Sequence, residues 1–311
     1  MRNDPLPRAF GEPVMAGVIR SEPEDFFVAE EPGFDLDGEG EHHYLHIEKR
    51  GQNTAWVAER LASFARVRAM DVSYSGRKDR HAVTHQWFSV WLPGRPAPAW
   101  ETLSIPGVRI METSRHSRKL RRGSHAANRF SVRLRDMTSA ADIDTRLSMI
   151  RDAGFPNYFG EQRFGRDGGN LARADALLRG DVRPDRKKDI YLSAARSHLF
   201  NLELAGRVAD GSWCEDGAWG WLPGSHRRPT ETFRATGFDA WYEGLERLGV
   251  KAMRRPLAAH APDLAWRIED DAFIVDFRLE SGAFATSLLR EFADYRQAAD
   301  GDVGTGAAAF G

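Results

Sequence analysis

The spacing of hydrophobic residues predicts alternating helices and strands along the first part of the chain. Between residues 53 and 66, apolar side chains recur every three or four positions behind an Asn-Thr pair, which is typical of an amphipathic helix capped by Asn53. Residues 72–76 and the segment HAVTHQWFSVWLPG alternate strictly instead, which predicts two strands. The sequence GRKDR between them is therefore expected in a loop or at a strand end, where a rigid sheet commonly holds reactive side chains.

Alternation and helical spacing return further along the chain. Residues 128–137 alternate as another strand, and a helix with Ser139 in its capping box is predicted to follow. Residues 272–279 alternate again, and Thr286 is expected to cap a last helix. The final segment, residues 298–311, has too little apolar content to pack and is predicted to be disordered.

The middle of the chain, residues 155–257, has a different character. Helical patterns follow Asn170 and Ser193, and the loops between them are dense in Gly, Pro and Trp. We therefore expect an α+β fold in two sequence halves, in which residues 1–154 and 258–311 form one discontinuous domain and residues 155–257 form an inserted domain.

Composition narrows the class of protein. A chain of 311 residues can bury a sizeable core, and its one cysteine, Cys214, excludes an intramolecular disulfide and fits a reducing compartment. No run of eighteen apolar residues and no apolar signal segment is present, so we expect a cytoplasmic protein without membrane contact.

Charge is segregated along the chain, although the formal net charge is only −1. Residues 22–41 carry nine carboxylates and no Lys or Arg, whereas residues 115–122 (RHSRKLRR) carry five cations and no acid. Such blocks are compatible with an electropositive face that binds phosphates, and equally with unrelated solvated surface.

Asp79 is the strongest candidate for chemistry. It is flanked by Arg77, Lys78 and Arg80, and neighbouring cations favour the ionised carboxylate. An ionised, partly desolvated carboxylate can act as a nucleophile or as a base. The alternative from composition alone is a surface turn whose charges face water, which is the commoner outcome for charged loops.

A metal hydrolase is one rival interpretation. His42, His43 and His46 lie close together, and His81 and His85 are four residues apart, a spacing that would suit a metal site on a helix. The segment around that second pair reads as a strand, however, and no HExxH motif completes a ligand set. We therefore expect no metal, and because neither a P-loop nor a GxGxxG pattern is present, no cofactor.

The segment GRKDRHAVTHQWFS resembles the signature of the tRNA pseudouridine synthase D family, in which the aspartate of a GxKDxxAxTxQ pattern is catalytic. Five further segments resemble that family in the same order along the chain: VIRSEPEDFFVAEEPGFDLDGEGEH, HSRKLRRG with the following NRF, FPNYFGEQRFG, SAARSHLFN and SGAFATSLLREF. The resemblance implies a pseudouridine synthase catalytic core with a mixed, largely antiparallel sheet, and an inserted α/β TRUD domain.

The resemblance also implies an activity. Members of the family isomerise uridine to pseudouridine at position 13 in the D-arm of tRNA, and tRNA-Glu is the implied partner. This reaction breaks the N1–C1′ bond and joins C5 to C1′ without redox change, so it requires no electron-carrying cofactor. Asp79 would attack the sugar or base, or would remove the 2′ proton to give a glycal, and the sequence leaves both routes open.

Site residues follow from the matching positions. Phe130 is expected to stack on the flipped base, with strand-core packing as the alternative, and Asn128 to contact the uracil edge. Arg20 stands where the family usually has a lysine and would orient Asp79, while Lys78 would contact the substrate.

Two further groups of residues are predicted to contact RNA or to shape its site. The predicted RNA-backbone contacts are Arg115, Arg118, Lys119, Arg121 and Arg122. Phe159, Gln162 and Arg163 are expected to line or brace a cleft between the two domains. The chain is expected to be a monomer without a protein partner, and a non-catalytic tRNA-binding protein on the same scaffold remains the second rival interpretation.

Overall fold

The computed structural model describes residues 6–138, 142–225 and 233–298. The chain divides into two compact units: unit 1 comprises residues 1–14, 140–264 and 282–293, and unit 2 comprises residues 15–139, 265–281 and 294–311. The predicted insertion at residues 155–257 falls within unit 1. The domain bounds themselves stay a prediction.

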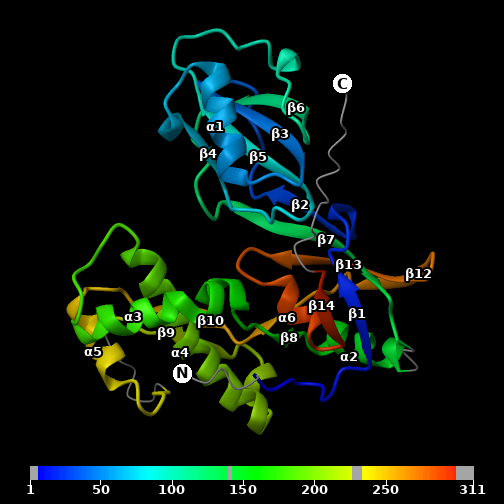
Figure 1. Cartoon of the computed structure of the whole chain (residues 1–311), viewed down its shortest axis with the longest axis vertical. Helices are drawn as coiled ribbons and strands as arrows, with labels where there is room; N and C mark the ends of the chain where they lie inside the picture. The colour runs from blue at the N-terminus through cyan, green and yellow to red at the C-terminus, as the bar shows by residue number, and fades with distance from the viewer. Residues whose placement is uncertain (1–5, 139–141, 226–232, 299–311) are drawn as a thin grey trace, which may run out of the picture. The chain divides into compact units, whose positions relative to one another are not determined.

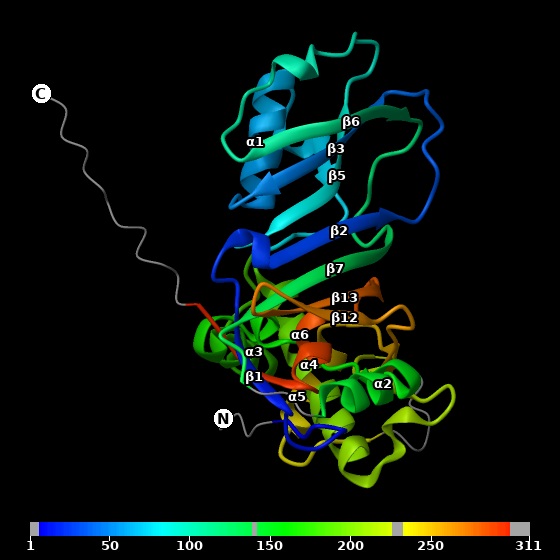
Figure 2. The ribbon, with the colours of Figure 1, turned by 90° about the vertical axis from the view of Figure 1, so that its right-hand side faces the viewer.

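Unit 2 is built on one large sheet, which Figures 1 and 2 show as a stack of strands. Among the described residues it has ten strands, of which seven lie in the order β12-β13-β7-β2-β5-β3-β6, while β4 pairs with β5, β1 with β7 and β14 with β1. Their bounds are β1 (Met15–Ile19), β2 (Phe26–Pro32), β3 (His42–Arg50), β4 (Val72–Tyr74), β5 (Val83–Trp91), β6 (Val108–His116), β7 (His125–Arg135), β12 (Ala265–Glu269), β13 (Ala272–Glu280) and β14 (Ala293–Gln297).

The sheet is mixed but largely antiparallel, as predicted. Strands β2 and β5 pair in parallel, and β7 pairs antiparallel with both β2 and β13. In that register Val132 lies between Phe26 and Val275, and Phe130 lies between Val28 and Phe277. Since residues directly opposite share a face of a sheet, these apolar side chains form one continuous inward face.

Helix α1 (Thr54–Ala65) covers part of that face, next to β3, β4 and β5 (Figure 1). Its inward residues, including Val57 and Leu61, pack against Leu45, Ile47 and Phe88. The predicted cap is confirmed, because Asn53 Oδ1 accepts a hydrogen bond from Ala55 N at 2.9 Å.

Unit 1 is rich in helices that enclose their own apolar core. Helices α3, α4 and α5 bury residues such as Leu178, Phe200 and Trp241 in one cluster. The elements of unit 1 are α2 (Ile143–Ala153), α3 (Gly169–Arg179), α4 (Lys188–Asp210), α5 (Asp239–Arg247), α6 (Ala285–Leu289), β8 (Phe155–Pro156), β9 (Trp219–Leu222), β10 (Met253–Pro256) and β11 (Ala258–Ala259).

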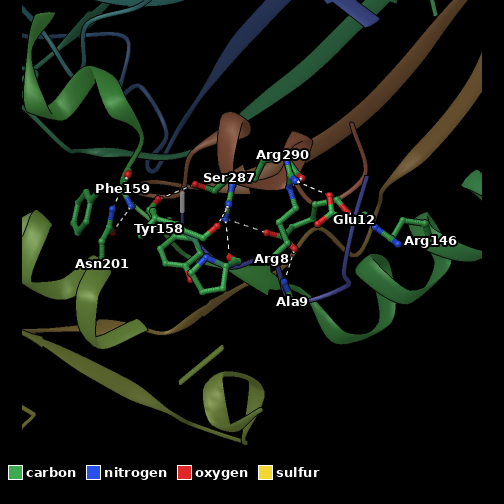
Figure 3. Close-up of polar contacts among 12 residues, drawn as sticks. Arg8, Ala9, Glu12, Arg146, Tyr158, Phe159, Asn201, Ser287 and Arg290 are labelled. Atoms are coloured by element: carbon green, nitrogen blue, oxygen red, sulfur yellow. Dashed lines mark hydrogen bonds and ion pairs between the residues drawn. The ribbon is translucent and has the colours of Figure 1, made fainter. Parts of the chain in front are cut away.

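The described N-terminal residues are tied to the end of unit 1 by polar contacts, which Figure 3 shows around Arg290. Arg290 donates through Nη1 to the Pro7 carbonyl oxygen at 3.1 Å and through Nη2 to that of Leu6. Glu291 is fully buried and accepts a hydrogen bond from Ala9 N at 2.8 Å. Residues almost three hundred positions apart therefore close unit 1 together.

Two predicted element starts differ from the structure. Thr286 lies inside α6, whose N-cap is Phe284, because the short helix begins two residues earlier than a cap at Thr286 would place it. Helix α4 begins at Lys188, before Ser193. Ser139 and residues 299–311 lie outside the described residues, so the capping box and the disordered end are untested.

No helix within the described residues combines the length and the apolar character needed to cross a lipid bilayer.

Candidate functional site

The loop that carries Asp79 joins β4 to β5, and a buried lysine fixes its backbone. Lys49 Nζ donates to the Asp79 carbonyl oxygen at 2.8 Å and to the Gln52 carbonyl oxygen at 3.0 Å. The Lys49 side chain is fully buried, and this burial lowers its pKa to about 8 against the opposing attraction of the Asp79 charge. One buried cation thereby holds the carbonyl oxygens of two residues, Gln52 and Asp79.

Helix α1 and strand β5 hold the same loop through Thr54 and Gln86. Thr54 Oγ1 accepts a hydrogen bond from Lys78 N at 3.1 Å and donates to Gln86 Oε1 at 3.0 Å. Gln86 Nε2 then donates to the Gly76 carbonyl oxygen at 3.2 Å. Since both side chains are buried, the backbone on either side of Arg77 is fixed by the sheet and by the first turn of α1.

Lys78 points away from solvent. Its Nζ lies 2.6 Å from Glu30 Oε2, and the two side chains are only 7 % and 1 % exposed. A buried ion pair of this kind loses several kcal/mol if one partner is removed, since the other charge is left unpaired. The placement gives Lys78 a role in holding the loop, and its predicted contact with substrate stays a prediction.

Arg20 meets the Asp79 carboxylate directly. Arg20 Nη2 lies 2.5 Å from Asp79 Oδ2, and Nη1 donates to Gln297 Oε1 at 3.1 Å, so the guanidinium fork bridges two side chains. Its Cζ also lies 4.1 Å from the centre of the Phe26 ring. Arg20 adopts a left-handed φ of 61°, a costly conformation that is concentrated at functional sites.

The Asp79 carboxylate remains open to a ligand. Its side chain is 34 % exposed, whereas the Arg20 side chain is only 7 % exposed. Within the described part of the chain, Arg20 is the only side chain that bonds the carboxylate, through Oδ2. The sequence placed these two residues together only by resemblance, and the structure brings them into contact.

Phe130 and Asn128 lie two positions apart on β7 and therefore on one face of the sheet. The half-buried Phe130 ring stacks on Phe277 at 5.1 Å and meets the edge of Phe26 at 6.2 Å, which links it to the ring under Arg20. Asn128 Oδ1 is a buried acceptor with no hydrogen-bond partner among the described residues. Such an unpaired buried acceptor is unfavourable, and the predicted contact of Asn128 with a base edge stays a prediction.

The five predicted backbone-binding cations are all exposed, and their contact with RNA stays a prediction. Arg115, at the end of β6, donates to the Gly40 carbonyl oxygen at 2.8 Å, and Lys119 donates to that of Met70 at 2.8 Å. Arg118 supplies a carbonyl oxygen to the Tyr44 hydroxyl. Lys119, Arg121 and Arg122 share the wall of a groove, whereas the other two do not line it.

Phe159, Gln162 and Arg163 belong to unit 1. Phe159 is a core residue whose backbone exchanges two hydrogen bonds with the Asn201 side chain, as the close-up in Figure 3 shows. Arg163 lies 5.2 Å above the Phe159 ring, and Gln162 is exposed. Phe159 therefore braces unit 1, and the predicted cleft between domains stays a prediction.

Sequence reasoning missed the buried polar residues that support the loop. Lys49 continues the inward alternation of Leu45 and Ile47, and Glu30 continues that of Phe26 and Val28. A charged residue at an inward position of an alternating strand is a signal that was available, since such residues are rarely buried unless paired.

No cluster of three or more His, Cys, Asp or Glu side chains suited to a metal ion occurs among residues 6–138, 142–225 and 233–298.

The fold and the arrangement around Asp79 define a mixed α+β protein with an arginine-paired carboxylate on a fixed loop. Residues 8–184, more than half of the chain, match the family model described as tRNA pseudouridine synthase D (TruD). The chain belongs to the tRNA pseudouridine synthase D family.

Individual relatives agree with this assignment. The chain is 44 % identical over 314 residues to a protein of Cellvibrio japonicus (strain Ueda107) named tRNA pseudouridine synthase D, with 92 % of each chain covered. It is 43 % identical over 336 residues to the protein of that name from Methylococcus capsulatus, covering 94 % of this chain and 95 % of the relative. A crystal structure of a candidate tRNA pseudouridine synthase D from Methanosarcina mazei shares the fold, with a TM-score of 0.68 at 17 % identity over 92 % of this chain and 95 % of that one.

Proposed function

We propose that this chain isomerises uridine to pseudouridine in tRNA, with Asp79 as the covalent or proton-abstracting catalyst. The observation that carries the proposal is the 2.5 Å contact between Arg20 and Asp79 on a loop fixed by buried side chains. The names of the relatives support the substrate class.

The residues around Asp79 have different roles. Arg20 occupies Oδ2 and orients the carboxylate, while Lys49, Thr54 and Gln86 hold the backbone that carries it. Such positioning lowers the barrier because the reacting group does not have to be ordered in the transition state. The exposed part of the carboxylate then attacks the nucleoside or removes the 2′ proton.

The extruded uridine is held on the same face of the sheet. Phe130 offers a ring for the base, and the Asn128 amide, turned towards the ligand, offers both a donor and an acceptor to the uracil edge. The finer parts of the proposal come from the family resemblance: the target is position 13 in the D-arm, the substrate is tRNA-Glu, and the enzyme acts in the cytoplasm as a monomer.

The test uses purified protein with unmodified tRNA-Glu and maps pseudouridine by sequencing. Asp79→Asn keeps the shape of the side chain and its contact with Arg20, and it is expected to lower kcat by about 10²–10⁴-fold or more while tRNA is still bound. Asp71→Asn is the matched control, because Asp71 pairs with Arg68 at 3.0 Å outside the site. A fully active Asp79→Asn protein would rule out the assigned role.

Two other outcomes separate the rival functions. Wild-type protein that binds tRNA without converting any uridine would identify a binding protein, and activity that is lost with a chelator would identify a metal enzyme. Deuterium at C2′ of the target distinguishes the two routes, since proton abstraction slows with the heavier isotope and direct attack at C1′ does not.

A further inference from the structure

A groove of about 460 Å³ lies beside the short strand β4 in unit 2. Strand β4 pairs with β5, and among the described strands no other pairs with it, so its second edge is open. One wall of the groove comes from α1, and residues 119–122 form another. The volume is of the size that small-molecule sites occupy.

The wall at residues 119–122 is cationic and firmly held. Lys119 Nζ donates to the Met70 carbonyl oxygen at 2.8 Å, and Gly123 N donates to the Ser75 carbonyl oxygen at 2.7 Å. Arg121 and Arg122 are exposed, and neither makes an ion pair with any of the described residues. Two unpaired guanidinium groups on an anchored segment suit a phosphate, which Arg binds through two parallel hydrogen bonds.

The α1 wall has the opposite character. Ala55 and Ala58 offer a small apolar surface, and Glu59 adds one exposed carboxylate. Met70, 66 % exposed, stands at the margin. Ser73 lines the groove too, and its buried Oγ has no partner among the described residues. The groove therefore combines the cations of residues 119–122 with an apolar surface and a hydrogen-bond acceptor from α1.

The groove is close to the catalytic loop along the chain. Ser73 and Asp79 are six residues apart, so their Cα atoms are separated by no more than ~21 Å. Ala55 in the groove also follows Thr54, which holds the loop. An RNA that presents a uridine to Asp79 has its neighbouring nucleotides within reach of this groove.

We propose that the groove binds a second, unpaired nucleotide of the same tRNA, with its phosphate on Arg121 and Arg122 and its base between Met70 and the α1 wall. Because Glu59 accepts but does not donate, the favoured base presents N–H donors to it, and guanine, whose N1–H lies beside its exocyclic amino group, offers two to one carboxylate. This inference rests on the proposed function and names an additional contact that selects the substrate.

The experiment is a double-mutant cycle between the protein and the tRNA. KM and kcat for pseudouridine formation are measured for wild type, Met70→Ala and the matched control Met111→Ala, which removes another exposed methionine of unit 2. Met70→Ala is expected to raise KM about two- to tenfold, the range for loss of one contact between a methionine sulfur and an aromatic ring. Met111→Ala is expected to match wild type.

The cycle is completed with tRNAs that carry one abasic nucleotide at each unpaired position in turn. At one position the abasic change is expected to abolish the Met70→Ala effect, and Glu59→Gln is expected to weaken binding of the intact tRNA most when that base is guanine. The inference is overturned if Met70→Ala equals Met111→Ala, or if no position couples to Met70.

The phosphate contact is tested by salt dependence. Replacing both Arg121 and Arg122 by alanine is expected to reduce the slope of log affinity against log salt by about 0.7, the value for one phosphate of a single strand, whereas Arg60→Ala on α1 is expected to leave it unchanged. If wild type converts no uridine, the affinities of the same variants for the same abasic tRNAs are measured directly by fluorescence anisotropy. Failure of the proposed function and failure of the groove are thus separate results.

Discussion

Lys49 occupies an inward position on β3 where an apolar side chain is the usual choice. Its burial lowers its pKa to about 8, so at neutral pH the protein holds a charged ammonium in a dry position at a cost to stability. In this position Lys49 donates two hydrogen bonds, to the carbonyl oxygens of Gln52 and Asp79. We therefore expect Lys49 to support activity by holding the Asp79 loop and to lower the stability of the folded protein.

Lys49→Met retains the buried stem and removes the charge. Its kcat is expected to fall at least ~10-fold, because the Asp79 backbone loses its donor. The stability difference should depend on pH. The unfolded chain binds a proton at Lys49 up to about pH 10.5, whereas the folded chain releases it near pH 8. The wild-type unfolding free energy should therefore rise relative to Lys49→Met between pH 8 and 10.5, by at most about 3 kcal/mol.

Urea unfolding of both proteins from pH 7 to 10.5 measures this difference, and all other titrating groups cancel because they are common to both. If the two stability curves run parallel over that range, the ammonium is not held in a costly environment.

At the level of elements, two helical glycines have opposite surroundings. Gly244 lies in α5, and a Cβ at this position would come within 2.4 Å of the Leu178 carbonyl oxygen. The absence of a side chain therefore allows α5 to pack closely against the backbone of α3. Gly206 lies on the exposed side of α4, and a Cβ there would have no neighbour within 4 Å.

Alanine at each position should therefore change stability in opposite directions. Gly206→Ala is expected to raise the free energy of unfolding by up to about 1 kcal/mol, the usual gain in a helix interior. Gly244→Ala is expected to lower it by about 1–3 kcal/mol, because backbone atoms of α3 must move. Urea unfolding of the two variants beside wild type gives the comparison, and equal signs would show that the α3–α5 contact is not close.

The sequence predicted those elements that depend on residues close together in the chain. Helix α1 and its Asn53 cap were predicted because both depend on residues within four positions of each other. Helix α6 was given the wrong cap, since Phe284 starts it without a polar side chain. The pairing of β13 with β7 was beyond sequence reasoning, because alternation gives a strand its two faces but not its partner.

The candidate site shows the same limit. Asp79, Asn128 and Phe130 came from the family resemblance, and the supporting set of Glu30, Lys49 and Gln86 did not. Their importance comes from contacts across three different strands, which a single sequence does not display.

For the whole molecule, the N-terminal segment is a structural part of unit 1. Deleting residues 1–9 removes the Ala9 donor from buried Glu291 and two carbonyl acceptors from Arg290. The expected loss is about 1–3 kcal/mol, because a buried carboxyl group loses one of its hydrogen-bond donors. Deletion of residues 1–5 alone is the control, since it removes none of these contacts. Thermal unfolding measures both, and equal midpoints would contradict the role of residues 6–9.

Both units take residues from the early and the late parts of the chain, and this has a consequence for synthesis on the ribosome. Strand β7 pairs with β13, which is synthesised much later, and residues 6–9 contact Arg290 and Glu291 near the end of the chain. Neither unit can therefore complete its contacts until translation is nearly over. The nascent polypeptide therefore exposes an unpaired edge of β7 until β13 has been synthesised, a state that favours aggregation and chaperone binding.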